Sequence, residues 1–209
     1  MTRDPESISP ETSISEASHR MARRHVRRLT VTRPGDDGQQ LVGIVSARDV
    51  ARAYPPDVNP FSAVPLARVL DRPVDEIMTP NPVTTSPTAP IEDVARLLRD
   101  RKIGALPVVT STRLVGIITE SDVFRAFLEV TGAQERSVRV TFDVAPGEDV
   151  FGEVATLAAR HHMEVTSLLP MRHDGRRLAV VRVAGARADA FVDDVWRAGH
   201  RVLSVLRTA

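Results

Sequence analysis

The chain has 209 residues, and its 28 basic and 27 acidic side chains leave a formal net charge of +1. So small a net charge does not draw the chain to nucleic acid or to a membrane surface by bulk electrostatics. Cysteine is absent, which excludes disulfides, thiol catalysis and zinc–thiolate sites, and no apolar run predicts a membrane span or a secretory leader, so we expect a cytoplasmic location.

An internal repeat organises the first part of the sequence. The pattern Met-Thr-x-x-Pro occurs at residues 1–5 and 78–82, and Leu-Val-Gly-Ile-(Val/Ile)-(Ser/Thr)-x-x-Asp-Val occurs at residues 41–50 and 114–123. The first copy is four residues longer between these landmarks, and the surplus lies around the turn at residues 34–38. Because an insertion in a loop leaves the apolar pattern intact, the two copies are predicted to share a fold and to pack as a pseudo-symmetric pair.

Each copy predicts the same order of elements. Apolar residues at helical spacing over residues 14–21 and 91–98 indicate a helix with one buried face. Ser13 and Glu16 form a possible capping box for the first helix, and Pro90 suits the first turn of the second. Short apolar strands follow at residues 29–31 and 41–45, and again at 106–109 and 114–118. A final helix opens at Ser46 or Thr119, which gives the unit β-α-β-β-α.

A proline-rich segment at residues 54–73 separates the two copies. Because it also contains many aliphatic side chains, it is expected to pack as an ordered connection rather than to act as a free tether. A second boundary is predicted at residues 131–135, where Gly132 suits a helix C-cap. We therefore predict a first repeat at residues 1–53, a linker at 54–73 and a second repeat at 74–130.

The remaining residues, 137–209, follow a different plan. Alternating apolar residues at 138–142 predict a strand, a helical stripe follows at 150–158, and two strands flank a hairpin turn at residues 173–175. Phe191, Val195 and Trp196 mark another helix, and residues 202–206 form a closing strand. The order β-α-β-β-α-β is that of the ferredoxin-like fold. The predicted fold class is therefore α/β (α+β) throughout.

The repeated pattern of Gly, two aliphatic residues, Ser or Thr, and Asp three residues later resembles the CBS domain, as does the strand Leu-Pro-Val-Val at residues 106–109. Two such repeats in tandem resemble a CBS pair, or Bateman module. The last domain, with Asp143, Pro146 and Gly147 between its first strand and first helix, resembles an ACT domain. Together they resemble the CBS-ACT proteins of the acetoin-utilisation type. This resemblance implies a link to acetoin catabolism or its control, and it supplies no catalytic residue.

Asp49 and Asp122 are the residues on which the predicted ligand binding depends. A carboxylate in the first turn of a helix can accept both hydroxyl groups of a ribose, while the free backbone amides and the hydroxyl of Ser46 or Thr119 favour a phosphate. Ser/Thr-x-x-Asp is also a helix-capping box, which needs no ligand. Both interpretations stay open for each aspartate, and the duplication within a CBS-like context favours nucleotide binding.

The resemblance also implies two clefts, each shared between the repeats. The Asp49 cleft, with Ser46, is expected to receive the base and to include Thr84, Gly104, Ala105, Leu106 and Pro107. The Asp122 cleft, with Thr119, is expected to receive a phosphate and to include Ile8, Arg27 and Arg28. The two arginines either clamp that phosphate or fill the cleft. Pro146 and Gly147 are candidate effector-binding residues of the ACT-like domain.

No nucleophile–base pair or phosphate-binding loop appears, so an enzyme is not expected, and the histidines lack metal-ligand spacing. An arginine cluster at residues 20–28 is typical of a solvated helix face, and nucleic-acid binding is a minor alternative. We expect a homodimeric regulatory protein that binds an adenine nucleotide, such as AMP or ATP with or without magnesium, and no other cofactor, and that acts on an unidentified protein. The main alternative is an interaction scaffold with empty clefts.

Overall fold

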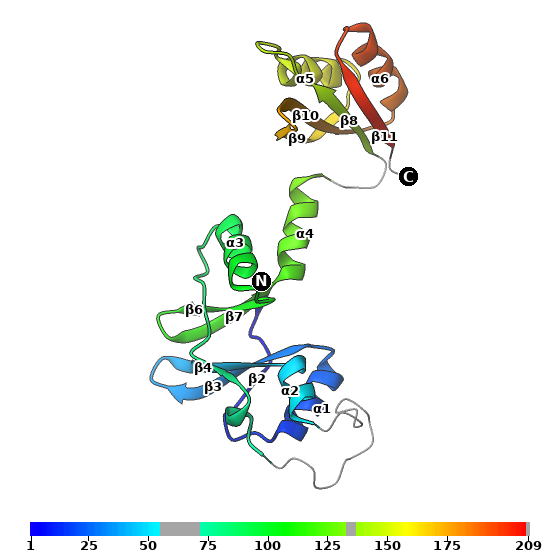
Figure 1. The fold of residues 1–209 in the computed structure, drawn as a ribbon. Helices are drawn as coiled ribbons and strands as arrows, with labels where there is room; N and C mark the ends of the chain where they lie inside the picture. Colours follow the sequence, from blue (N-terminus) through cyan, green and yellow to red (C-terminus); the bar gives the residue numbers. More distant parts are fainter. Residues whose placement is uncertain (55–71, 133–136, 208–209) are drawn as a thin grey trace. The chain divides into compact units, whose positions relative to one another are not determined.

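The computed structural model describes residues 1–54, 72–132 and 137–207. The chain divides into two compact units, Met1–Val123 and Phe124–Ala209. Most of the predicted linker and part of the predicted boundary at 131–135 lie outside the described residues. Both units contain sheets and helices, which confirms the mixed α/β class (Figure 1).

The two repeats make up the first unit, except that residues 124–130 of the last helix belong to the second unit. The first repeat comprises β1 (Thr2–Arg3), β2 (Ser7–Ile8), α1 (Ile14–Arg24), β3 (Arg28–Gly35), β4 (Gly38–Ser46) and α2 (Ala47–Ala53). The second comprises a 3-10 turn at Val74–Glu76, β5 (Thr79–Pro80), α3 (Ile91–Arg101), β6 (Ala105–Thr110), β7 (Arg113–Thr119) and α4 (Glu120–Val130). This duplication is that of a pair of β-α-β-β-α units.

The repeats exchange their first strands. β1 of the first repeat pairs with β7 of the second, and β5 of the second pairs with β4 of the first. The two exchanges are equivalent in register, because Thr2 lies opposite Ile117 and Thr79 lies opposite Ile44. A direct pair between β4 and β7, at Gln40 and Arg113, joins the two hairpins, so that all seven strands belong to one sheet.

The four-residue insertion lengthens a hairpin of the first repeat. β3 and β4 have eight and nine residues, whereas β6 and β7 have six and seven. Each strand of the first hairpin is therefore two residues longer, and the pairing continues to Gly35 and Gly38 beside the turn. The four extra residues therefore extend the paired strands β3 and β4 and do not lengthen the turn between them.

Each repeat has its own apolar core. Side chains from the predicted helix stripe pack on the strands in both, with Ile14 and Met21 on Leu29 in the first and Leu98 on Leu106 in the second. The helices thus bury the faces that their apolar spacing predicts.

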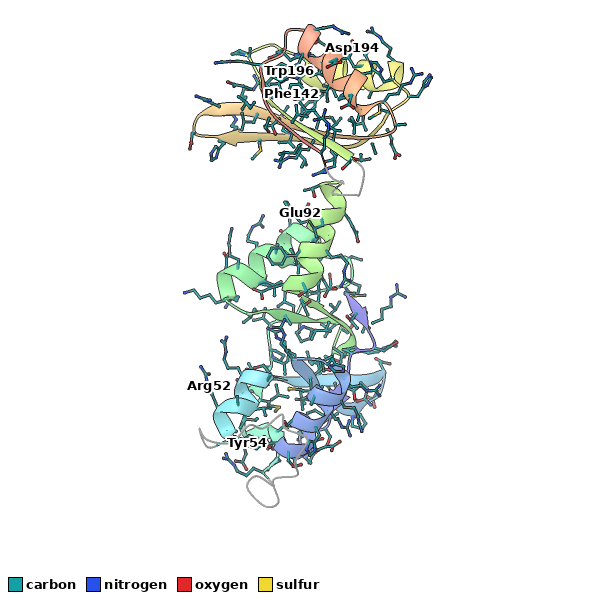
Figure 2. All side chains as sticks on the ribbon, turned by 90° about the vertical axis from the view of Figure 1, so that its right-hand side faces the viewer. Arg52, Tyr54, Glu92, Phe142, Asp194 and Trp196 are labelled. Carbon is teal, nitrogen blue, oxygen red and sulfur yellow. The ribbon has the colours of Figure 1, made fainter. Side chains whose placement is uncertain are left out.

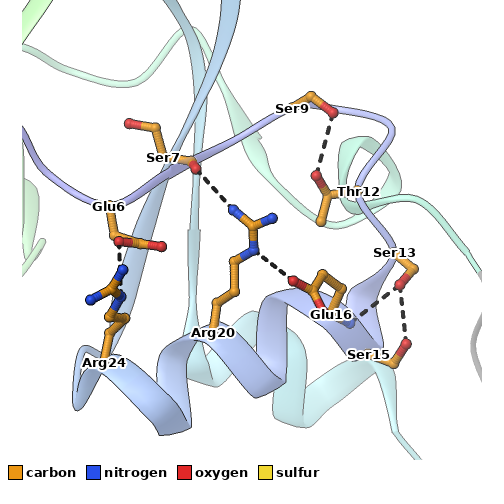
Figure 3. Close-up of polar contacts among 9 residues, drawn as sticks. All are labelled: Glu6, Ser7, Ser9, Thr12, Ser13, Ser15, Glu16, Arg20 and Arg24. Carbon is orange, nitrogen blue, oxygen red and sulfur yellow. Dashed lines mark hydrogen bonds and ion pairs between the residues drawn. The ribbon is translucent and has the colours of Figure 1, made fainter.

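The start of α1 differs from the predicted capping box in one respect. Ser13 caps the helix, because its Oγ accepts a hydrogen bond from the backbone N–H of Glu16 at 3.2 Å. The Glu16 carboxylate does not complete the box; it accepts a hydrogen bond from Arg20 Nε at 2.7 Å instead (Figure 3). Arg24 likewise pairs with Glu6 at 3.4 Å. Two arginines of the predicted basic cluster therefore have carboxylate partners.

The second unit has the ferredoxin-like element order, with β8 (Ser137–Asp143), α5 (Val150–Arg160), β9 (Glu164–His173), β10 (Arg176–Ala184), α6 (Ala188–Arg197) and β11 (Val202–Arg207). Its antiparallel sheet has the order β11-β8-β10-β9, and the helices lie on one face of it. Phe142 is fully buried in the core between them. The spacing of Trp196 predicts that its side chain packs in this core, but it does not. Trp196 is 51% exposed, and Val192 packs in the core instead (Figure 2).

Candidate functional site

The two aspartates singled out in the sequence both form complete capping boxes. Asp49 Oδ2 accepts hydrogen bonds from the backbone N–H and the hydroxyl of Ser46 at 2.9 and 2.6 Å, and Ser46 Oγ accepts from the Asp49 N–H. Asp122 Oδ2 and Thr119 repeat this arrangement at 2.9 and 2.8 Å. The helix-capping interpretation is therefore correct for both residues.

The capping hydrogen bonds to each aspartate involve only one of its two carboxylate oxygens. In each box the same atom, Oδ2, accepts both hydrogen bonds. Asp49 Oδ1 has no hydrogen bond to the described residues, and Asp122 Oδ1 lies 3.9 Å from the amino nitrogen of Met1. A second carboxylate oxygen of Asp49 is thus held in a fixed direction at the start of α2. Ribose hydroxyls need an acceptor of this kind.

Arg28 connects the two repeats. It is the first residue of β3, opposite Ser46 in the ladder, and its side chain extends to Gly104 in the second repeat. A Cβ atom on Gly104 would clash with Arg28 Nη2 and would lie 3.1 Å from both Arg28 Cζ and Glu120 Oε2. The absence of a side chain at residue 104 therefore provides the space that the guanidinium occupies.

The electrostatic surroundings of Arg28 are mixed. Partial burial lowers the pKa of its guanidinium most, and the positive charges of Arg27 and Arg48 lower the pKa further. Glu120 and Asp49 act in the opposite direction. Arg28 thus lies within electrostatic range of a carboxylate from each repeat. Arg48 and Glu120 were missed by the sequence reasoning, although their opposite charges inside the two Ser/Thr-x-x-Asp motifs could have marked them.

The other predicted cleft residues are placed by the ladders of the first unit. Ala105 lies opposite Thr119 and the buried Pro107 lies opposite Ile117, both within the second repeat. Leu106 and Ile8 are buried at 0% and 4% exposure in the two apolar cores, so their side chains stabilise the walls of the repeats. Thr84, which is half-buried, directly precedes the residue that bridges to Val108.

In the second unit the loop that carries Pro146 and Gly147 borders a hollow of about 620 Å³. Pro146 lines it, together with Glu148 from the same loop, Gly175 and Arg176 from the β9–β10 hairpin, and Arg201 before β11. Gly147 has a φ of +84° and open space around its Cβ position. The predicted effector loop therefore lies beside a concave and charged surface.

The buried side chain of His200, which precedes β11, contacts the loop that carries Pro146 and Gly147. His200 Nδ1 lies 2.7 Å from Glu148 Oε1, and the other oxygen of Glu148 accepts the N–H of Ala145 at 2.8 Å. His200 Nε2 lies at ion-pair distance, 2.6 Å, from Glu153 Oε2 without hydrogen-bond geometry. The bond from His200 is the largest cause that lowers the pKa of Glu148, followed by the bond from the Ala145 N–H.

The described residues also bear on metal binding and on membrane insertion. They contain no group of three or more histidine and carboxylate side chains placed to hold a metal ion. No helix among them is both long and apolar enough to cross a bilayer.

Comparison with known families decides what the repeated unit is. A model of the CBS domain matches residues 1–56 and 74–129, which together make up more than half of the chain. The chain belongs to the CBS domain family. The match covers both repeats, so the two repeats are a tandem CBS pair.

Relatives of this CBS pair occur in proteins of different architecture. CBSX2, a chloroplastic CBS domain-containing protein of Arabidopsis thaliana, is 30% identical over 149 residues, which cover 62% of this chain and 61% of CBSX2. Inosine-5'-monophosphate dehydrogenase of Korarchaeum cryptofilum is 31% identical over 147 residues, or 69% of this chain and 27% of that enzyme. The chain thus spans less than two thirds of the length of either relative.

Two solved structures are similar to the chain over about six tenths of its length. CBSX2 in complex with AMP has a TM-score of 0.51 at 32% identity, covering 62% of this chain and 93% of that structure. A putative acetoin utilization protein, AcuB, from Vibrio cholerae has a TM-score of 0.51 at 29% identity, covering 61% of this chain and 87% of that structure.

Proposed function

We propose that this protein is a non-catalytic regulator that senses an adenine nucleotide through its CBS pair. The observation that carries the proposal is the duplicated aspartate geometry, in which Asp49 and Asp122 each cap a helix through Oδ2 at equivalent positions of the two repeats. Support comes from CBSX2, which is similar over the same share of the chain and was solved with AMP.

In this proposal each aspartate binds the ribose of a nucleotide in its own cleft. Ser46 and Thr119 assist as the neighbouring hydroxyl groups, and the small residues Gly104 and Ala105 leave room for the base. Thr84, Leu106 and Pro107 complete the Asp49 cleft, and Ile8, Arg27 and Arg28 complete the Asp122 cleft. The CBS repeats are assigned to residues 1–53 and 74–130, with the linker at 54–73 between them.

We further propose that residues 137–209 form an ACT-like domain that dimerises or binds a small effector. The ferredoxin-like order and the loop with Pro146 and Gly147 beside the 620 Å³ hollow support this assignment. The similarity to AcuB supports a link to acetoin utilisation. The regulated partner would then be a protein whose state changes when the CBS pair is occupied.

A thermal-shift panel of adenosine, AMP, ADP and ATP, with and without Mg²⁺, tests the function. A ligand at 100 times its dissociation constant adds about 2.7 kcal/mol to the free energy of unfolding, which raises the melting temperature measurably. Stabilisation by any of these compounds supports the sensor. The absence of stabilisation across the panel favours a scaffold with empty clefts.

A further inference from the structure

A second hollow of the second unit, of about 370 Å³, lies where the end of the β9–β10 hairpin meets the first turn of α5. Most of its lining is apolar and comprises Val144, Phe151, Pro170, Met171, Leu178 and Ala179. The remaining two residues are Arg172 and Arg177. A hollow of this volume, with a mainly apolar lining and few polar groups, is typical of a site for a small molecule.

The two arginines lie directly opposite each other in the β9–β10 ladder. Like charges at such positions destabilise a sheet unless an anion compensates them. Neither arginine forms an ion pair within residues 137–207, whereas Arg197 and Arg207 of the same unit each pair with an aspartate. The positive charge beside the hollow is therefore uncompensated, and it is not a general property of the arginines of this unit.

The charged and the apolar side chains line the hollow from the same face of the sheet. Residues two apart in a strand face the same side, and Ala179 packs in the core under the helices. Arg177, two residues before Ala179, therefore faces the helices, as does Arg172 opposite it. Phe151 of α5 packs against the same core. Two guanidinium groups thus stand beside an apolar surface that is large enough for a few carbon atoms.

No free carboxylate is available near these arginines in the described part of the chain. The lining of the 370 Å³ hollow contains none, and the adjoining hollow of about 620 Å³, which shares Arg177, has only Asp143 and Glu148. Asp143 pairs with Arg201 at 3.3 Å, and Glu148 Oε1 lies 2.7 Å from His200 Nδ1. An ammonium group would therefore have no free acceptor here and would be repelled by the arginines.

We infer that the 370 Å³ hollow binds a small organic carboxylate that has a short aliphatic body and lacks an amino group. Its carboxylate lies between Arg172 and Arg177, because a guanidinium binds a carboxylate through two parallel hydrogen bonds. Its aliphatic body packs beside Phe151. This inference rests on the proposed effector-binding role of the second domain and deepens it by naming the class of effector. An α-amino acid carries an ammonium group and is therefore disfavoured.

Nuclear magnetic resonance titration of the full chain with four probes tests this inference. Isovalerate has both the carboxylate and the aliphatic body. Valine adds an ammonium group to the same skeleton, isoamyl alcohol replaces the carboxylate by a hydroxyl group, and acetate lacks the aliphatic body. Isovalerate should bind about 10-fold more tightly than each of the other three, because each lacks one of the expected interactions or adds a repulsion.

Arginine variants assign the binding to the hollow. Arg172→Gln and Arg177→Gln should each lower the affinity for isovalerate about 10- to 100-fold and leave that for isoamyl alcohol unchanged. Arg187→Gln is the matched control, since Arg187 is an exposed arginine of the same unit that lines neither hollow, and it should change neither affinity.

Two results would overturn the inference and leave the effector-binding role intact. One is an amino acid that binds as tightly as isovalerate. The other is an unchanged affinity for isovalerate in both Arg172→Gln and Arg177→Gln. If neither the four probes nor a panel of amino acids binds, the effector-binding role itself fails and this inference falls with it.

Discussion

Thr2 and Ile117, which belong to different repeats, lie opposite each other in an antiparallel pair of strands. Because Thr79 and Ile44 form the equivalent pair, each repeat completes the sheet of the other. The geometry of the Asp49 and Asp122 helix starts therefore depends on both repeats being folded together.

Gly116→Ala tests this exchange. A Cβ atom at residue 116 would lie 2.9 Å from the backbone oxygen of Thr2, so that β1 must shift. We expect the free energy of unfolding to fall by about 1 to 3 kcal/mol, as for other overpacked sites, in urea titrations followed by circular dichroism. Gly43→Ala, at the equivalent position, meets mainly the flexible side chain of Met78 and should cost less. Equal stability of all three proteins would argue against a tight strand exchange.

Asp49→Ala and Asp122→Ala separate capping from binding. Since both aspartates complete capping boxes, each variant should lose about 1 kcal/mol of stability. If Oδ1 also binds a ribose, the affinity at that cleft should fall about 10- to 100-fold, because hydrogen bonds to charged groups contribute about 1.5 to 3 kcal/mol.

Ser46→Ala is the matched control for Asp49→Ala, since it weakens the cap and retains the carboxylate. Calorimetry and thermal unfolding on the same samples distinguish the two roles. Should Ser46→Ala and Asp49→Ala lower affinity and stability in parallel, Asp49 would have only a structural role.

The exposed apolar face of α4 allows a test of the proposed homodimer. Phe124, Phe127 and Leu128 follow helical spacing and are 68%, 62% and 56% exposed. Neighbouring exposed apolar side chains on one helix are typical of an interface. Phe124→Glu combined with Phe127→Glu should give a single-subunit mass in light scattering at micromolar concentration, whereas Glu129→Lys on the same helix should not. A single-subunit mass of the unchanged protein would rule out the dimer.

The sequence predicts most of the fold because the relevant signals are local. The apolar spacing around Ile14 and Val94 and the repeated Ser/Thr-x-x-Asp pattern locate helices and their starts, and the structure agrees with them. The partner of Glu16 was not predictable in the same way, since a carboxylate at that position can serve either the helix N-terminus or an arginine one turn later.

The relation between the clefts is not local, and the sequence predicts it less well. The contact between Arg28 and Gly104 joins residues in different repeats, and it depends on the path of one long side chain. Periodicity carries no information about such a path. The exposure of Trp196 is a similar case, because the helix spacing leaves its side chain and that of Val192 as competing candidates for the same core.

The His200–Glu148 contact predicts acid sensitivity of the second unit. Because the bond from His200 holds the pKa of Glu148 below its ordinary value near 4.5, the folded state binds fewer protons than the unfolded state there. The stabilisation is therefore present above pH 4.5 and lost as the pH falls below it. We expect the free energy of unfolding to change less between about pH 5 and pH 3, the range in which a carboxylate with a lowered pKa titrates, in Glu148→Gln than in the unchanged protein. Urea unfolding followed by the fluorescence of Trp196, the single tryptophan, measures this change. The same change in both proteins would count against the contact.

Gly147→Val tests whether the loop beside the 620 Å³ hollow binds an effector. Gly147 and Gly175 have φ values of +84° and +77° with open space around their Cβ positions, so a valine at either residue is strained by the backbone and not by a clash. Gly175→Val is therefore a control of equal strain. If the loop is the effector site, only Gly147→Val should abolish the response to amino acids or acetoin-related metabolites in calorimetry, and AMP binding should be retained in both. A domain used for dimerisation alone would give no response in the unchanged protein, and equal loss in both variants would point to general destabilisation of the loops.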